Sequence, residues 1–246
     1  MRKNKDQVSS PLAGKVALVT GASQGIGRAI AEALARQDCN LILTGRNQSR
    51  LDQAAKGLKL GGAKVLPLAC DVREPAQVEA LMDAVRRKFR RLDILINNAG
   101  VSHSNLEISK LPLDLWREVI ETNLTGTFLV TQAALPLMKS GGAIVNNLSI
   151  AAKRVFAGAS AYNASKHGAL GFTNTLREEL RTKGIRVVAL LPGATDTAIW
   201  NTFWPDAPRK KMMSAETVAR AVVSALALPA NSTLEELTLM PSAGEL

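Results

Sequence analysis

The sequence predicts an α/β fold: a single doubly wound domain of about seven parallel strands, with helices on both faces of the sheet. Short apolar runs alternate along the chain with longer segments in which apolar residues recur at helical spacing. Glycine or proline follows several of the apolar runs, as expected where a strand leads into a turn. Uninterrupted apolar strands are typical of a parallel sheet covered on both faces, and right-handed crossovers then give the double winding.

The first five elements alternate between strand and helix. Residues 16–20, 40–44 and 64–69 are short apolar runs, which predict buried strands. Between them, residues 25–37 and 48–60 carry apolar side chains at helical spacing, and a diglycine stops the second helix. The chain is therefore expected to begin as a βαβαβ unit.

The middle of the chain continues this alternation with longer helices. Residues 75–89 predict a helix with proline in its first turn, and residues 92–96 predict the fourth strand. A helical pattern over 113–138 is expected to bend near Asn123. A strand over 143–148 and a second long helix over 160–182 follow it.

The last part of the chain contains one segment without periodicity. A sixth strand is expected over 185–191, and a helix over 215–226 and a strand over 234–240 close the chain. Residues 195–213 contain three aromatic side chains and two prolines, and so long a loop in a compact domain is usually functional. We expect a lid there, within a single catalytic domain over 15–246 that follows a flexible tail over 1–14.

Composition places the chain among ordinary globular proteins. Its 246 residues are 46% hydrophobic and 21% charged, unlike a disordered or fibrous chain. No run reaches the roughly 18 apolar residues of a membrane-spanning helix, and no apolar signal segment follows the charged N-terminus. Because the only cysteines are Cys39 and Cys70, no disulfide framework is expected; the expected location is the cytoplasm, with no membrane partner.

The net charge of +10 raises the question of an acidic partner. Part of the excess lies in three clusters: Arg2, Lys3 and Lys5; Arg86, Arg87, Lys88, Arg90 and Arg91; and Arg209, Lys210 and Lys211. We interpret these as a solvated tail, a helix end and a loop. Because the chain has few aromatic residues to stack on bases, no nucleic-acid partner is expected. An acidic small molecule or carrier protein suits the charge better.

A glycine-rich loop joins the first strand to the first helix. It contains Gly21, Ser23, Gln24, Gly25, Ile26 and Gly27. Glycines let the backbone approach a pyrophosphate, which the positive end of the following helix also favours, so the loop predicts dinucleotide binding. The same residues satisfy G-x-S-x-G, the nucleophile elbow of hydrolases. That chemistry needs a histidine late in the chain, whereas His167 falls in mid-helix.

The second strand ends near an arginine, where NAD-binding folds usually place an acidic residue. Arg46 offers a guanidinium to a 2′-phosphate, so NADP is favoured over NAD as the cofactor; the alternative is an exposed arginine at a helix start. After the third strand, Asp71 and Val72 are placed to meet the adenine. The alternative for Asp71 is a helix N-cap.

Three residues are candidates for acid–base chemistry. Tyr162 and Lys166 stand four positions apart on one helix face. A neighbouring ammonium lowers the pKa of a phenol, which is otherwise about 10. Ser149 follows the fifth strand, where its hydroxyl would open onto the cofactor crevice. The chain's two histidines, His103 and His167, lack metal-ligand spacing, so no metal site is expected.

Together these motifs resemble the short-chain dehydrogenase/reductase family, which has a Rossmann fold, over about residues 14–240. The glycine loop, Ser149, Tyr162 and Lys166 match its cofactor and catalytic motifs. Also similar are Asn97-Asn98-Ala99-Gly100, in the motif that steadies its sheet and flanks the adenosine; Asn123, in the position of its active-site asparagine; and Pro192, Gly193, Thr195 and Thr197, in the segment that receives the nicotinamide carboxamide.

The resemblance implies a role for each catalytic residue. Tyr162 would exchange a proton with the carbonyl oxygen, Ser149 would hydrogen-bond that oxygen, and Lys166 would lower the phenol pKa and hold the nicotinamide ribose. Asn123 would interrupt its helix so that its carbonyl oxygen holds a water molecule in a proton relay. Nearby, Ala152, Val155, Phe156 and Ala157 suggest a mainly apolar pocket, although Lys153 and Arg154 could meet an anionic substrate.

The expected activity is therefore NADP(H)-dependent interconversion of a ketone or aldehyde and an alcohol. The resemblance and the basic charge make a 3-oxoacyl thioester on an acyl carrier protein one candidate substrate. A catalytically idle dinucleotide sensor or scaffold is the alternative, and a hydrolase comes third. Family members commonly pair their two long helices between subunits, so the resemblance implies a homodimer or homotetramer.

Overall fold

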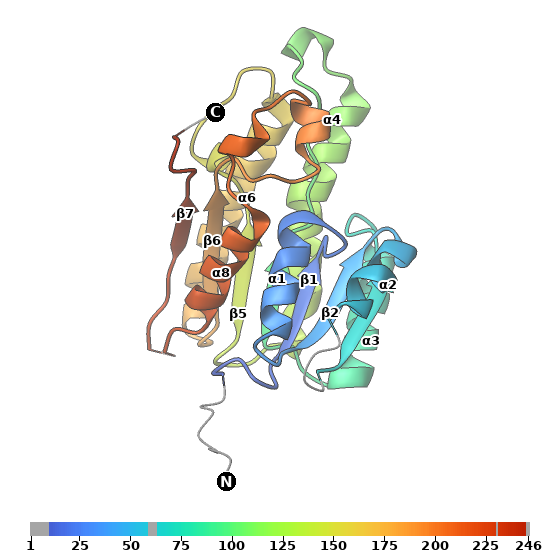
Figure 1. Ribbon diagram of the computed structural model, residues 1–246. Helices are drawn as coiled ribbons and strands as arrows, with labels where there is room; N and C mark the ends of the chain where they lie inside the picture. Colours follow the sequence, from blue (N-terminus) through green and yellow to red (C-terminus); the bar gives the residue numbers. More distant parts are fainter. Residues whose placement is uncertain (1–9, 59–62, 230, 245–246) are drawn as a thin grey trace.

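The computed structural model describes residues 10–58, 63–229 and 231–244. They form one sheet in the order β3-β2-β1-β4-β5-β6-β7, with every neighbouring pair parallel (Figure 1). The strands are β1 (Val16–Thr20), β2 (Asn40–Gly45), β3 (Val65–Ala69), β4 (Ile94–Asn97), β5 (Ala143–Asn147), β6 (Arg186–Pro192) and β7 (Glu236–Leu239). Each lies close to its predicted range, and the predicted parallel sheet is confirmed.

Helices cover both faces of this sheet. They are α1 (Gly25–Ala35), α2 (Gln48–Lys56), α3 (Pro75–Phe89), α4 (Leu113–Ile120), α5 (Gly126–Ala134), α6 (Ser160–Arg181), α7 (Trp200–Phe203) and α8 (Ala215–Leu226). Residues of α1, α2 and α8 pack on one face, and residues of α3, α5 and α6 on the other. The two-residue period of a strand produces this division: Ala17 and Val19 of β1 join the first layer, and Val16 and Leu18 join the second.

The predicted tail over 1–14 is only partly testable, because residues 1–9 lie outside the described ranges. The part that is described does not behave as a tail. Leu12 is buried in the core, and the Ser10 hydroxyl donates to the Gln37 side chain at 2.6 Å. Leu12 belongs to the same core cluster as the buried residues of α1, and this packing fixes the short segment.

The predicted long helix over 113–138 is interrupted where a bend was expected. Between α4 and α5 the chain forms one π-helical turn, Glu121–Thr125, and after α5 it ends in a 3₁₀ turn, Leu135–Leu137. Proline at position 136 explains the end of the regular helix. The π turn places Asn123 on the buried side, next to the carboxyl ends of the strands.

A chain of buried polar side chains ties the two central strands to the helices above them. Asn97 of β4 donates to Thr131 of α5 and to Asn146 of β5, both at 2.8 Å. Asn146 in turn donates to Thr173 of α6 at 2.9 Å. Buried polar groups are costly unless paired, so this network fixes the spacing of β4, β5, α5 and α6.

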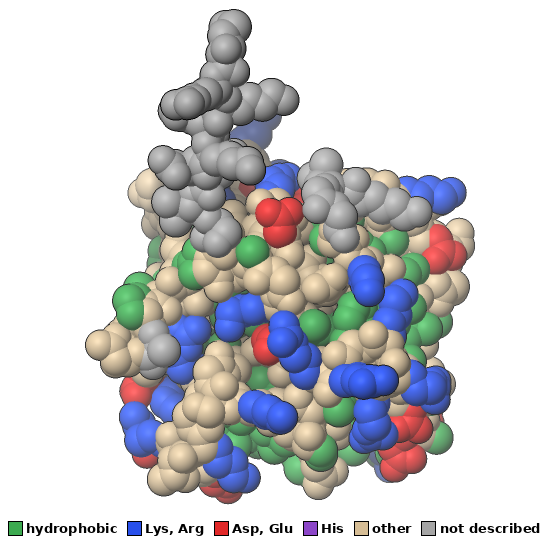
Figure 2. All heavy atoms as spheres, turned by 90° about the horizontal axis from the view of Figure 1, so that it is seen from below, with side chains coloured by type: hydrophobic (Ala, Val, Ile, Leu, Met, Phe, Trp, Pro, Cys, Tyr) green, Lys and Arg blue, Asp and Glu red, His purple; other side chains and the backbone are tan. Residues whose placement is uncertain are grey.

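Basic side chains are spread over the face at the amino ends of the strands (Figure 2). The last turn of α3 contributes Arg86, Arg87 and Lys88 to this surface. Cations at a helix C-terminus interact favourably with the helix dipole, which agrees with the predicted helix end. Residues 209–211 form a 3₁₀ turn within the predicted loop, and the cluster of Arg2, Lys3 and Lys5 lies outside the described residues.

Candidate active site

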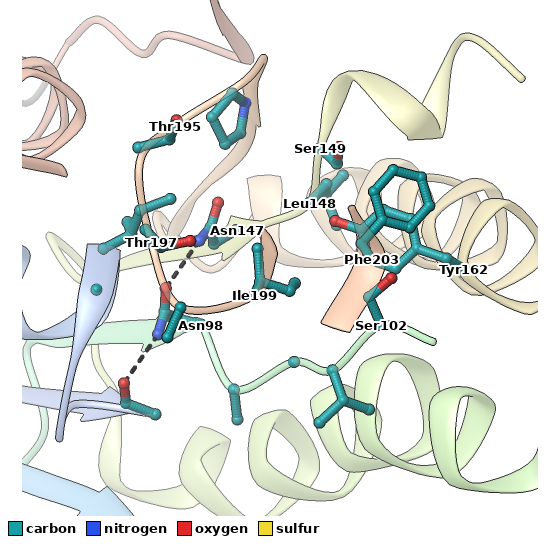
Figure 3. A pocket seen from close by; sticks show the side chains of 18 of the residues that line it. Asn98, Ser102, Asn147, Leu148, Ser149, Tyr162, Thr195, Thr197, Ile199 and Phe203 are labelled. Atoms are coloured by element: carbon teal, nitrogen blue, oxygen red, sulfur yellow. Dashed lines mark hydrogen bonds between the residues drawn. The ribbon is translucent and has the colours of Figure 1, made fainter. Parts of the chain in front are cut away.

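A cleft of about 350 Å³ opens at the carboxyl ends of the strands, where β1 and β4 lead to opposite sides of the sheet. Nearly all the predicted site residues line it: Gly21, Ser23, Gln24, Gly25, Ile26, Arg46, Asp71, Val72, Asn98, Ala99, Gly100, Ser149, Tyr162, Lys166, Pro192, Gly193, Thr195 and Thr197. Gly27 and Asn123 do not. Segments far apart in the sequence therefore meet in one place (Figure 3).

The glycine loop adopts the backbone that its sequence predicts. Gly21 and Gly25 have φ of +63° and +56°, a region that side chains disfavour. Gly27 has a packing role instead: a Cβ there would clash with the Asn98 side chain and the Gly21 carbonyl. This glycine lets α1 lie close to β4, which explains why it does not line the cleft.

The described residues fit a dinucleotide. Gln24, at the N-cap of α1, makes no side-chain cap, so the first N–H groups of the helix face the cleft without a capping side chain. A Cβ on Gly25 would lie 3.2 Å from the Thr197 methyl group, so glycine keeps the channel between loop and Thr197 open. A narrow channel at an uncapped helix N-terminus suits a pyrophosphate.

Hydrogen bonds fix the loop against the neighbouring strands. The Asn98 side chain donates to the carbonyl oxygens of Thr20 (2.9 Å) and Gly21 (3.2 Å), and accepts from the Asn147 side chain at 2.7 Å (Figure 3). The Thr20 hydroxyl accepts from the backbone N–H groups of Asn98 and Ala99, at 2.8 and 2.9 Å. The predicted Asn98 thus lies between the cofactor loop and β5.

Arg46 and Asp71 both line the cleft, but their surroundings differ. The Arg46 side chain is 58% exposed, and its nearest acid, Glu118, is 3.8 Å away. Asp71 is held by Arg73 in a two-pronged ion pair of 2.6 to 3.1 Å, which lowers the pKa of its carboxyl. The alternative that Asp71 caps α3 is wrong, because Glu74 occupies the N-cap. Arg46 is therefore the cation that a ligand can recruit.

Ser149, Tyr162 and Lys166 all line the cleft. Ser149 follows β5 and accepts from the Ala151 N–H at 3.1 Å, which fixes its side chain. The Lys166 Nζ donates to the Asn147 carbonyl at 3.1 Å and lies 5.5 Å from the centre of the Tyr162 ring. Strand β5 and helix α6 thus supply the hydroxyl, the phenol and the amine.

Burial sets the titration of this group. It raises the pKa of the Tyr162 phenol, and a hydrogen bond with Ser149 counteracts part of that rise. Burial lowers the pKa of Lys166 from 10.5 to about 8. The expected lowering of the phenol pKa by Lys166 is therefore not the dominant effect, because loss of hydration outweighs an amine that is itself desolvated.

Asn123 lies behind the cleft rather than in its wall. Its side chain accepts from the Val101 N–H at 2.8 Å and donates to the Val101 carbonyl at 2.9 Å and the Ser165 hydroxyl at 3.0 Å. Its main-chain carbonyl accepts from the Thr127 hydroxyl at 2.9 Å. The side chain thus joins the π turn to α6 and to the loop after β4.

Residues 195–213 fold over the mouth of the cleft. The Arg209 guanidinium donates to Asp196 (2.8 Å), the Thr197 carbonyl (2.7 Å) and Asn201 (2.7 Å). The Trp200 indole N–H donates to the Thr195 carbonyl at 2.9 Å. The segment is therefore held in one arrangement by its own side chains.

Comparison with known proteins assigns the family. Residues 15–208 match the short chain dehydrogenase family. The chain belongs to this family. An uncharacterised oxidoreductase of Staphylococcus aureus strain N315 is 37% identical over 232 residues, which cover 94% of this chain and 98% of the relative. This confirms the predicted oxidoreductase class.

Solved structures agree. An alcohol dehydrogenase from Thermococcus sibiricus, complexed with 5-hydroxy-NADP, is 31% identical with a TM-score of 0.88, covering 94% of this dehydrogenase and 98% of that chain. A 3-ketoacyl-(acyl-carrier-protein) reductase from Brucella melitensis, complexed with NADH, is 29% identical with a TM-score of 0.85 over 94% and 98% of the two chains. The predicted family is thus confirmed.

Some residues of the dehydrogenase's cleft were not predicted. Asn147 accepts from Lys166 through its carbonyl and supports Asn98 through its amide, and Met240 and Gly244 line the cleft from beyond β7. The asparagine pair at the end of an apolar strand was a signal for Asn147. Nothing in the sequence pattern indicates that the chain returns to the cleft after β7.

The hydrolase alternative finds no support in the dehydrogenase's site. Ser23 lines the cleft, but neither His103 nor His167 does, so the serine has no base. The His103 and His167 rings contact the Ser104 and Asn163 carbonyls. Within the described ranges, no three potential ligands gather around a metal position, and no helix is long and apolar enough to span a membrane.

Proposed function

We propose that this dehydrogenase interconverts a ketone or aldehyde and an alcohol with NADP(H). The observation that carries the proposal is the meeting of Ser149, Tyr162 and Lys166 in a cleft that the glycine loop also lines. A bound nicotinamide would supply or accept the hydride. The protein's own share is to hold the carbonyl oxygen and to move one proton.

Tyr162 holds that proton. Because burial raises its pKa, the phenol remains protonated at neutral pH and can donate to the oxygen of a carbonyl that is being reduced. The Ser149 hydroxyl donates a second hydrogen bond to the same oxygen as negative charge develops. Lys166 stabilises the tyrosinate left behind and, through its position beside Asn147, is placed to hold a ribose hydroxyl. Asn123 positions these groups from behind.

The remaining site residues hold the dinucleotide. The loop of Gly21, Ser23, Gln24, Gly25 and Ile26 would hold the pyrophosphate, with Gly27 giving the close packing. Asp71, Val72, Asn98, Ala99 and Gly100 would flank the adenosine, and Pro192, Gly193, Thr195 and Thr197 would receive the nicotinamide. Arg46, which is 58% exposed and paired with Glu118 only at 3.8 Å, favours NADP over NAD.

Three further proposals concern the substrate and partner, the location and the segment over the cleft. The similarity to a 3-ketoacyl-(acyl-carrier-protein) reductase supports a 3-oxoacyl thioester as a candidate substrate, and an acyl carrier protein as a candidate partner. The free, buried Cys39 and Cys70 support the cytoplasm as the location. We propose that residues 195–213 act as a lid, within a single catalytic domain.

The test is a turnover assay with a panel of ketones, aldehydes and thioesters and both reduced cofactors. Tyr162→Phe should lower kcat by about a thousandfold or more and leave cofactor affinity nearly unchanged, because it removes the proton but keeps the ring. Reduced-cofactor absorbance gives kcat, and fluorescence titration gives the affinity. Turnover by no substrate would support the idle sensor instead, and a Tyr162→Phe variant with most of its activity would overturn the proton assignment.

A further inference from the structure

The cleft has a second half that the dinucleotide residues do not occupy. Figure 3 shows Ser102 and Phe203 on the side of Tyr162 and Ser149, whereas Asn98, Thr195 and Thr197 lie toward the other end and Ile199 lies between the two groups. The reacting hydroxyls therefore belong to this second half. Its other residues form the walls around whatever is bonded to the reacting carbonyl.

The charged side chains that line the cleft are not available to a group bound in this half. Among the described residues, the charged side chains that line the cleft are Arg46, Asp71 and Lys166, each assigned to the dinucleotide. Lys153, expected to meet an anionic substrate, instead pairs with Glu236 of β7 and does not line the cleft. That expectation was wrong because β7 brings its own acid to the lysine. A charged substituent would lose its hydration here without gaining a partner.

Aromatic side chains line this half of the cleft instead of charged ones. Trp200 packs edge-to-face on Phe203, with ring centres 5.7 Å apart, and lies 6.4 Å from Trp204. All three line the cleft, and Phe156 lines it from the loop after β5. The Trp200 indole N–H is already used by the Thr195 carbonyl, so the ring presents only apolar surface to a ligand.

The apolar wall of the cleft continues to the protein surface. Trp204 lines the cleft and is also 42% exposed, which places it at the mouth. A large apolar side chain exposed at the edge of an apolar pocket gains contacts only when a ligand covers it. A substrate that reaches from Tyr162 to Trp204 would bury this aromatic surface.

Resting on the proposed function, we propose that the substrate is an uncharged ketone that carries a bulky aromatic or polycyclic group. Its one required polar atom is the carbonyl oxygen, which Ser149 and Tyr162 meet, and its apolar body packs against Trp200, Phe203 and Trp204. Short polar ketones and ketones with an anionic substituent fit this half of the cleft poorly.

Two matched pairs of ketones test this. α-Tetralone is cyclohexanone with a fused benzene ring, and para-acetylbenzoate is acetophenone with an added carboxylate. With NADPH, kcat/KM should be at least about tenfold higher for α-tetralone than for cyclohexanone, and about tenfold lower for para-acetylbenzoate than for acetophenone. Equal values within either pair, or a reversed order, would overturn the proposal.

Variants connect the preference to the aromatic wall. Phe203→Ala should reduce the α-tetralone to cyclohexanone ratio about fivefold or more, with Phe203→Leu intermediate and a safeguard against a folding defect. Leu234→Ala is the control, since Leu234 is 38% exposed and does not line the cleft. An unchanged ratio in both Phe203 variants would contradict the assignment.

Binding distinguishes this proposal from the proposed function. If no ketone of the panel is turned over, the proposed function fails, but affinities can still be measured by quenching of tryptophan fluorescence, since Trp200 and Trp204 are two of three tryptophans. Tighter binding of α-tetralone than of cyclohexanone would support the apolar site without catalysis. Equal or absent binding would refute it.

Discussion

At the scale of a single residue, the proposed catalytic role of Lys166 carries a cost in stability. The side chain is only 6% exposed, and burial lowers its pKa from 10.5 to about 8. A shift of this size corresponds to about 3 kcal/mol by which the folded state disfavours the ammonium. The protein tolerates that cost where the amine is needed, beside Tyr162 and the Asn147 carbonyl.

This predicts that Lys166→Met stabilises the protein at pH 7. The folded-state pKa lies below the unfolded value, so the penalty is full below pH 8 and fades as pH rises toward 10.5. The variant should gain about 1–3 kcal/mol at pH 7, and its advantage should shrink by about 1 kcal/mol by pH 9. Urea unfolding of both proteins without cofactor measures this.

The exposed Lys139→Met variant serves as the control, and it should show no such pH-dependent difference. Burial raises the pKa of Cys39 to about 12 and that of Cys70 to about 11, and this effect cancels in the comparison because both proteins contain the same thiols. A Lys166→Met protein that is less stable than the natural one at pH 7 would show that the amine is stabilising.

The proposed role of Arg46 in cofactor preference is equally local. Arg46→Ala should lower kcat/KM with NADPH about 10- to 100-fold, the value of one or two charge-assisted hydrogen bonds, and leave NADH nearly unaffected. Steady-state kinetics with both cofactors measure this, and Arg50→Ala on the neighbouring exposed surface is the control. An equal loss with both cofactors would assign Arg46 a structural role, and a natural enzyme that uses both equally would contradict the preference for NADP.

Residue identities could be predicted where a local pattern carries them. Gly21 and Gly25 need positive φ, and Tyr162 and Lys166 share a helix face, so spacing made both pairs candidates and the family resemblance gave them roles. Ion-pair partners could not be predicted, because Lys153 meets Glu236 from the last strand and the closure of the sheet brings them together. Burial could not be predicted either, because it depends on the whole fold. It raises the pKa of Tyr162, whereas the sequence led us to expect a lowered pKa.

At the scale of elements, the segment 195–213 is the part least stabilised by regular secondary structure. It contains only the short α7 and a 3₁₀ turn, and its residues carry few hydrogen bonds of regular structure. Arg209 compensates by joining Asp196, Thr197 and Asn201. A lid of low intrinsic stability that one side chain fixes is suited to opening and closing.

Arg209→Ala should therefore loosen the lid without unfolding the protein. KM for cofactor should rise about 5- to 30-fold, because Thr197 no longer stays beside Gly25. Hydrogen exchange over 196–203 should accelerate while the sheet keeps its protection. The exposed neighbour Lys210→Ala is the control. Unchanged exchange in that segment would contradict the role of Arg209.

The elements themselves followed from periodicity, with one informative exception. The pattern over 113–138 predicted a bend but not its form, since a π turn depends on Asn123 reaching Val101 across the cleft wall. The lid's aromatic residues were visible in the sequence, but their orientation toward the cleft was not. Local patterns thus indicate where an element breaks, and tertiary contacts decide how.

At the scale of the whole molecule, part of the positive charge lies away from the cleft. Many basic residues lie on the face at the amino ends of the strands (Figure 2), and the cleft lies at the carboxyl ends. A net charge of +10 is therefore weak evidence for an anionic substrate in this protein. The order of the strands, by contrast, directly fixes the position of the cleft.

The assembly of the molecule gives the last prediction. On α5, Phe128 is 42% exposed and packs edge-to-face with Phe172 of α6, with ring centres 6.2 Å apart. Such a surface on the two long helices supports the proposed homodimer or homotetramer. Light scattering coupled to size exclusion should show a dimer or tetramer at micromolar concentration.

Phe128→Glu should convert that assembly to a monomer. In a two-fold interface each substitution acts twice, because the same residue faces its copy or a symmetric neighbour, and two buried carboxylates cost more than a modest interface supplies. Leu234→Glu, which removes another exposed apolar side chain near β7, should leave the assembly unchanged. A monomeric natural protein would refute the pairing, and a Phe128→Glu protein that keeps its mass would move the interface to another face.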